Sequence, residues 1–186
     1  MKKIVVILIT FFLFIGTVNA KKMEVTLVEC VDGDTARFKL NKEEIKVRFI
    51  GIDTPESVKA NTEVEPYGKE ASKYTCNKLK KANEIEIEYE ENSDKQDRYG
   101  RTLAYVFVDD KLLESLILKK GYASVKYTKN NYKYIDELKK AEEYAKEKKL
   151  GIYSDEEYIY EEDDIITLIS DYVSKFVNKL LAKILQ

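Results

Sequence analysis

The chain has 186 residues, of which 44% are hydrophobic and 35% are charged, and its formal charge is −2. These values are typical of one ordinary globular domain with appendages. The chain contains no histidine, which excludes the commonest general base and zinc ligand. Hydrolytic chemistry would therefore have to use carboxylates, arginines and a metal ion that prefers oxygen.

The N-terminal residues 1–20 have the pattern of a secretory signal peptide. Lys2 and Lys3 form a basic start, residues 4–16 are apolar except for Thr10, and small residues lead up to Ala20. The apolar run is shorter than the roughly 20 residues that span a bilayer, so a signal peptide is favoured over an uncleaved membrane anchor. We expect cleavage near Ala20 and a secreted protein, whether extracellular, surface-held or periplasmic.

Three β-rich runs follow, at residues 24–31, 35–40 and 45–50. Turn signals at Asp32-Gly33 and Asn41-Lys42 separate them, so they predict a three-stranded meander.

A helix is predicted to open at Pro66-Tyr67 and to end near Asn83. Residues 85–89 then alternate apolar side chains with glutamates, which is the period of a strand. We expect the glutamates at positions 84, 86, 88 and 90 to form its solvated face.

Residues 101–108 predict a fifth strand, and residues 112–120 a short helix that Gly121 caps. A longer helix starts near Ile135 and ends at Gly151. Five strands, with helices after the third and the fifth and a final helix, predict an α+β fold. The predicted architecture is mainly β, a five-stranded Greek-key barrel of the OB type with three helices.

Charge separates the domain from the C-terminal tail. Residues 21–155 hold 27 basic and 27 acidic side chains, whereas residues 156–186 hold 3 and 7. We predict a domain at 21–155, an acidic linker at 156–164 and an amphipathic helix at 165–186. This helix could dock on its own domain, pair with a partner or lie on a membrane surface.

The two cysteines, Cys30 and Cys76, are compatible with a disulfide in an oxidising compartment. Cys30 lies in a strand-like run, and its interpretation as a small buried apolar residue is favoured.

The candidate site residues are ordinary when each is considered alone. Asp34 belongs to a turn sequence, Asp53 and Glu56 to a capping or turn sequence, and Arg48 and Arg101 to strands. A closed meander, however, can bring four of them to one rim, namely Asp34, Arg48, Asp53 and Glu56. Two carboxylates and a main-chain carbonyl there suit Ca²⁺, a third carboxylate could activate water, and two guanidinium groups suit a phosphodiester.

The chain contains, in order, Val31-Asp32-Gly33-Asp34-Thr35, Arg48, Ile52-Asp53-Thr54-Pro55-Glu56, Tyr67-Gly68-Lys69-Glu70-Ala71, Asp97-Arg98-Tyr99-Gly100-Arg101, Leu103-Ala104-Tyr105 and Leu150-Gly151-Ile152-Tyr153-Ser154. In this order and spacing, over residues 24–155, the chain resembles the staphylococcal nuclease (thermonuclease) family. The resemblance implies an OB-type barrel and a Ca²⁺-dependent endonuclease and exonuclease of DNA and RNA that leaves 3′-phosphate ends.

The resemblance also implies roles for individual residues. The metal would be held by Asp34, Asp53 and the carbonyl of Thr54, the general base would be Glu56, the scissile phosphate would contact Arg48 and Arg101, and the nucleotide would contact Arg98, Tyr99 and Tyr127. The tyrosines would give a stacking surface that tolerates any base. We expect a monomer.

Two alternatives to a nuclease are open. The first is an OB-fold nucleic-acid-binding module without catalysis, although such modules typically lack the acidic and arginine set that this chain retains. The second is an adaptor that contacts a membrane or a partner through residues 165–186. The balanced charge of the domain counts mildly against tight polyanion binding.

Overall fold

The computed structural model describes residues 22–57, 65–158, 166, 169–170 and 172–179. The predicted signal peptide at residues 1–20 lies outside the described residues. The elements, in chain order, are β1 (Met23–Glu24), β2 (Thr26–Asp32), β3 (Thr35–Leu40), β4 (Glu43–Phe49), β5 (Ile52–Asp53), α2 (Gly68–Lys81), β6 (Ile85–Glu88), β7 (Thr102–Val108), β8 (Lys111–Leu112), α3 (Leu113–Lys119), β9 (Ser124–Val125), α4 (Ile135–Glu147) and the 3₁₀ turn η1 (Gly151–Tyr153).

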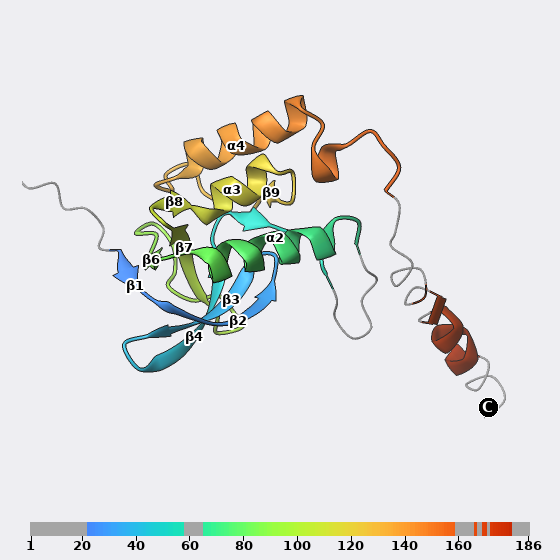
Figure 1. Ribbon diagram of the computed structural model, residues 1–186, viewed down its shortest axis with the longest axis horizontal. Helices are drawn as coiled ribbons and strands as arrows, with labels where there is room; N and C mark the ends of the chain where they lie inside the picture. The colour runs from blue at the N-terminus through green and yellow to red at the C-terminus, as the bar shows by residue number, and fades with distance from the viewer. Residues whose placement is uncertain (1–21, 58–64, 159–165, 167–168, 171, 180–186) are drawn as a thin grey trace, which may run out of the picture.

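The main sheet has the strand order β1-β6-β7-β4-β3-β2, with β8 paired to β7. Strands β2, β3 and β4 form the predicted antiparallel meander, while β4 and β7 pair in parallel. Only Val25 separates β1 from β2, so one chain segment pairs with β6 at one end and with β3 at the other. The sheet therefore curls back on itself (Figure 1). Its two edge strands, β1 and β2, are consecutive parts of this segment and are not joined by a hydrogen-bonded ladder.

The predicted α+β fold of the OB type is confirmed. All five predicted strands are present, as β2, β3, β4, β6 and β7. The described residues add four two-residue strands, β1, β5, β8 and β9, which the sequence pattern did not predict. A two-residue strand has too little periodicity to be recognised from sequence.

The core lies between the curved sheet and helices α3 and α4, which stack on one side of it (Figure 1). Phe38 and Phe49 from the sheet and Leu113 and Leu138 from the helices are 0% exposed. Burying each such side chain contributes about 1.5–3 kcal/mol. The apolar side chains of α4 recur every three to four residues and are buried, at Ile135, Leu138, Ala141 and Ala145.

The acidic strand β6 is not the solvated face that the alternation predicts. Glu88 is 1% exposed and Glu90 is 4% exposed. Glu88 accepts hydrogen bonds from Lys133 Nζ and, at 2.8 Å, from Tyr134 Oη; Glu90 accepts from Tyr105 Oη at 2.9 Å and from the Lys133 N–H at 2.7 Å. Buried carboxylates are tolerated when such donors surround them, so the prediction was wrong for these two glutamates.

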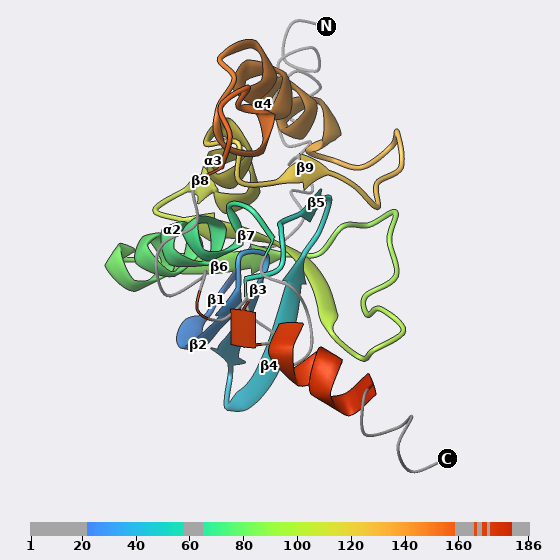
Figure 2. The same cartoon turned by 90° about the vertical axis from the view of Figure 1, so that its right-hand side faces the viewer.

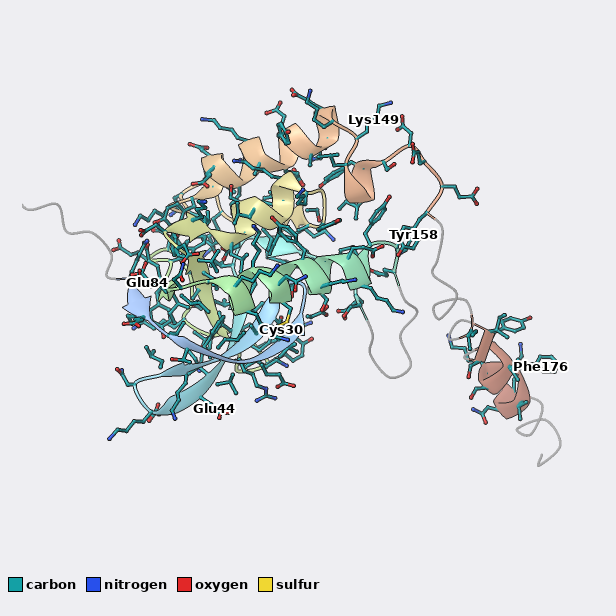
Figure 3. The ribbon with its side chains drawn as sticks, in the orientation of Figure 1. Cys30, Glu44, Glu84, Lys149, Tyr158 and Phe176 are labelled. Atoms are coloured by element: carbon teal, nitrogen blue, oxygen red, sulfur yellow. A yellow bond between two sulfur atoms is a disulfide. The ribbon has the colours of Figure 1, made fainter. Side chains whose placement is uncertain are left out.

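A disulfide joins Cys30 on β2 to Cys76 on α2, and Figure 3 shows Cys30 beside this helix. The favoured interpretation of Cys30 as a lone buried residue is therefore wrong. Helix α2 packs against β2 and brings the two Cα atoms to 5.6 Å, within the range that a disulfide requires. The bond ties α2 to the strand that leads into Asp34.

The tail is helical at residues 172–179, within the predicted helix at 165–186. Tyr172, Val173 and Phe176 are 73%, 52% and 59% exposed. No helix in the described part of the chain has the length and apolar composition to cross a membrane. The start of the acidic linker contacts the domain, because Tyr158 Oη donates to Glu70 Oε1 at 2.8 Å (Figure 3).

Candidate active site

A single cleft of about 940 Å³ contains most of the predicted site residues. Its lining includes Asp34, Arg48, Asp53, Glu56, Arg98, Tyr99, Arg101 and Tyr127. They come from the β2–β3 turn, the end of β4, β5 and its following segment, and two loops. Figure 2 shows these loops, between β6 and β7 and between β9 and α4, extending on the same side of the molecule. The structure therefore brings together residues that are far apart in sequence.

Asp34 is held at the start of β3, where it is 7% exposed. Its Oδ1 accepts a hydrogen bond from Thr35 Oγ1 at 2.9 Å, and its Oδ2 accepts from the Thr54 N–H at 3.1 Å. The preceding Gly33 makes this approach feasible. A Cβ at Gly33 would lie 2.7 Å from Thr54 Oγ1 and 3.0 Å from Ala71 Cβ, so this glycine is required for close packing.

Arg48 lies between the two carboxylates that are predicted to hold a metal. Its Nη2 is 2.9 Å from Asp34 Oδ2 and 2.9 Å from Asp53 Oδ1. Its Nη1 donates to the carbonyl of Phe49 at 2.9 Å and to that of Ile52 at 2.7 Å. Four acceptors thus fix the planar guanidinium group in a side chain that is 10% exposed, which limits the number of positions the three charged groups can adopt.

Arg101 is oriented by Asp97, a residue to which sequence reasoning gave no role. Asp97 Oδ2 accepts from Arg101 Nε at 2.6 Å, and Asp97 Oδ1 accepts from the N–H groups of Tyr99 and Arg101 at 2.9 Å each. Burial alone would raise the pKa of Asp97, but these hydrogen bonds outweigh it and lower the pKa. The ion pair uses Nε, and among the described residues no ion pair involves the two Nη groups of Arg101, which suit a phosphate.

Tyr99 lies close to two guanidinium groups in the cleft lining. The guanidinium carbon atoms of Arg98 and Arg101 are 4.8 Å and 5.6 Å from its ring centroid, and Arg98 Nη2 donates to Tyr99 Oη at 2.7 Å. Tyr99 is 69% exposed and Tyr127 is 75% exposed. The cleft thus has a cationic and aromatic rim, a composition that suits the backbone and bases of a nucleic acid.

Glu56 lines the cleft just beyond β5. Its N–H donates to Glu65 Oε2 at 3.0 Å, and the first residue of α2, Gly68, packs on its backbone. A Cβ at Gly68 would lie 2.3 Å from the carbonyl oxygen of Glu56, a distance that forces a shift. The start of α2 therefore sets the position of Glu56.

Three further cleft or site residues had no predicted role. Asp32 lines the cleft and accepts from Ser57 Oγ at 2.8 Å; burial raises its pKa, and the negative charges of Asp34 and Glu56 raise it further. Tyr132 also lines the cleft and is 7% exposed. Lys126 Nζ donates to Asp53 Oδ2 at 3.0 Å. Only the three-dimensional contacts identify these three residues as part of the site. In the sequence, Asp32 has the pattern of a turn residue.

The donor set at this site fits a hard divalent cation. Within the described part of the chain, no three Cys, Asp or Glu side chains gather to hold a metal by themselves. Asp34, Asp53 and the carbonyl of Thr54 would therefore need water molecules to complete a shell, as Ca²⁺ commonly accepts. The buried Thr54 Oγ1 has no hydrogen-bond partner among the described residues. This oxygen can therefore bind a polar group that lies beside it.

Sequence comparison assigns the family. The family model described as "Staphylococcal nuclease homologue" matches residues 46–155. The chain therefore belongs to the staphylococcal nuclease family, as its motifs indicated.

Three relatives extend this assignment. The chain is 38% identical over 139 residues to the "Thermonuclease" of Staphylococcus hyicus, covering 75% of this chain and 80% of that protein. It is 41% identical over 143 residues to "Endonuclease YncB" of Bacillus subtilis (strain 168), covering 76% of this chain and 67% of that protein. It is 44% identical over 138 residues to the "SPbeta prophage-derived endonuclease YokF" of the same organism, covering 74% of this chain but 46% of that relative.

Proposed function

We propose that the protein is a Ca²⁺-dependent nuclease that hydrolyses phosphodiester bonds of DNA and RNA and leaves 3′-phosphate ends. One observation carries this proposal: the Asp34–Arg48–Asp53 cluster lies in the same cleft as Glu56 and Arg101. The names of the relatives, an endonuclease and a thermonuclease among them, support it.

The metal would be held by Asp34, Asp53 and the carbonyl of Thr54. When bound, Ca²⁺ supplies positive charge to the phosphate oxygens and a polarised water. Arg48 and Arg101 offset the charge that develops at phosphorus, since guanidinium groups bind phosphoryl oxygens in pairs. These residues are already oriented by their carboxylate partners.

Glu56 accepts a proton from the attacking water in this scheme. The water oxygen then forms a bond to phosphorus, and the bond from phosphorus to the 5′ oxygen breaks. The departing 5′ oxygen takes a proton from solvent water, so the products are a 3′-phosphate and a 5′-hydroxyl. At the rim, Arg98 would contact the backbone while Tyr99 and Tyr127 stack on the bases.

A cleavage assay on single-stranded DNA and RNA tests the proposal. Cleavage should occur in Ca²⁺ and stop in chelator, and Asp34→Ala should lower the rate by about 10²–10³-fold. Asp110→Ala is a matched control, because Asp110 is exposed and lies outside the cleft. Full activity in chelator would refute the metal assignment, and normal turnover of Glu56→Gln would refute the general base. Binding without cleavage in Ca²⁺ would favour the non-catalytic module.

We also propose that the mature protein is secreted. The Cys30–Cys76 disulfide supports this, since such bonds persist in oxidising compartments. N-terminal sequencing of protein from culture medium and from cell fractions should give a chain that starts after Ala20. A protein retained in the cytoplasm with Met1 in place would contradict the proposal. Contact of residues 165–186 with a membrane or a partner stays a prediction.

A further inference from the structure

The pairing of two short strands places Lys126 beside the predicted metal site. Strands β5 and β9 are antiparallel, with Ile52 opposite Val125 and Asp53 opposite Ser124. The pairing continues for one more residue, because the Lys126 N–H donates to the carbonyl of Gly51 at 3.1 Å. Lys126 is therefore the diagonal neighbour of Asp53 on the same face of the strand pair. A long side chain can reach across the distance between two such diagonal positions.

Asp53 is engaged by a different cation at each carboxylate oxygen. Oδ1 is 2.9 Å from Arg48 Nη2, and Oδ2 is 3.0 Å from Lys126 Nζ. The two cations differ in how firmly they are held. The Arg48 side chain is 10% exposed and has three further acceptors, whereas the Lys126 side chain is 52% exposed and has Asp53 as its ion-pair partner.

We infer that Lys126 competes with a divalent cation for Asp53 Oδ2 and so lowers the metal affinity of the site. The inference rests on the proposed function, in which Asp53 is a metal ligand. A cation that binds this oxygen must displace the exposed ammonium group rather than the buried guanidinium group, because an exposed ion pair contributes little to stability. Metal binding then frees Lys126 next to Tyr127, so the metal site and the substrate rim are linked.

Isothermal titration calorimetry of Ca²⁺ with the full chain tests this inference without measuring activity. Lys126→Met should bind Ca²⁺ about three- to tenfold more tightly than the wild-type chain, because a competing charge is removed from the site. Lys126→Arg keeps a cation and should not gain affinity. Lys46→Met is the matched control, since Lys46 lines the same cleft and its loss removes the same charge.

Two results would overturn the inference. One is an unchanged or weaker Ca²⁺ affinity in Lys126→Met while the wild-type chain binds the ion. The other is an equal gain in Lys46→Met, which would assign the effect to general charge rather than to the contact with Asp53. If neither the wild-type chain nor Lys126→Met binds Ca²⁺, the metal assignment of the proposed function fails instead. Thermal unfolding without Ca²⁺ checks that all variants are folded.

Discussion

Asp34 and Arg48 at the centre of the cleft are 7% and 9% exposed, whereas Tyr99 and Tyr127 at its rim are 69% and 75% exposed. The centre is held by a dense set of hydrogen bonds and ion pairs, and the rim tyrosines can adapt. Groups that stabilise a transition state must be fixed in advance, while a stacking surface works for any base without a fixed register. The two regions should therefore fail differently when they are altered.

The largest effect is expected from Arg48→Lys. Lysine keeps the charge but cannot reach two carboxylates and two carbonyls with a planar fork. We expect kcat on single-stranded DNA at saturating Ca²⁺ to fall about 10³-fold. Arg37→Lys is the control, because Arg37 is an exposed residue of the same sheet paired with Glu29. A loss of less than about tenfold would show that the fork geometry is not needed.

A smaller loss of activity is expected from Gly68→Ala, which replaces none of the predicted catalytic residues. The added Cβ would displace the backbone of Glu56, since it would lie 2.3 Å from the carbonyl oxygen. A misplacement of about 1 Å can cost about 10²-fold in rate, so kcat should fall by about 10–100-fold. Asn77→Ala, at an exposed position of the same helix, should keep the wild-type rate. Equal rates for the two variants would contradict a positioning role for Gly68.

At the rim, Tyr99→Ala and Tyr127→Ala should change binding rather than turnover. Stacking contributes about 1–3 kcal/mol per base, so KM should rise about tenfold for each variant while kcat changes little. Tyr144→Ala is a matched control, because Tyr144 is a 47% exposed tyrosine on α4 outside the cleft lining. A fall in kcat with an unchanged KM would place these tyrosines at the reacting phosphate and remove the distinction between centre and rim.

The sequence predicted the fold and the gathering of the site through local signals. Alternating strands, turn residues and motif spacing gave the five long strands, and the helices followed from their apolar periodicity. The contacts that it did not predict join distant segments. Lys126 is 73 positions from Asp53, and Lys133 is 45 positions from Glu88. Alternation identifies the two faces of a strand, but not which other segment covers a face, so it does not predict that Lys133 and Tyr134 cover Glu88.

The smallest effect on activity is expected from Glu114→Gln, a change in the core outside the cleft. Glu114 is 0% exposed, and its carboxylate oxygens accept from the Val106 N–H at 3.1 Å and 3.3 Å. Burial raises the pKa of Glu114 well above 4.5; nearby Glu137 raises it further, and Arg48 opposes the shift. Since the folded chain binds this proton more tightly than the unfolded chain, the contribution of Glu114 to stability is greatest at low pH and falls as the pH rises toward the folded pKa.

Glutamine has no such proton to lose, and its amide oxygen can still accept from Val106. We therefore expect Glu114→Gln to unfold at a higher temperature than the wild-type chain and to keep an unchanged kcat. The difference in stability should grow by up to about 1.4 kcal/mol per pH unit as the pH rises above the ordinary carboxyl pKa of 4.5 toward the raised pKa of the folded chain. Calorimetric unfolding across this range measures the effect. Glu143→Gln on the exposed side of α4 should reproduce the wild-type profile. Parallel pH profiles for all three chains would contradict this prediction, because they would mean that Glu114 has the same pKa in the folded and the unfolded chain.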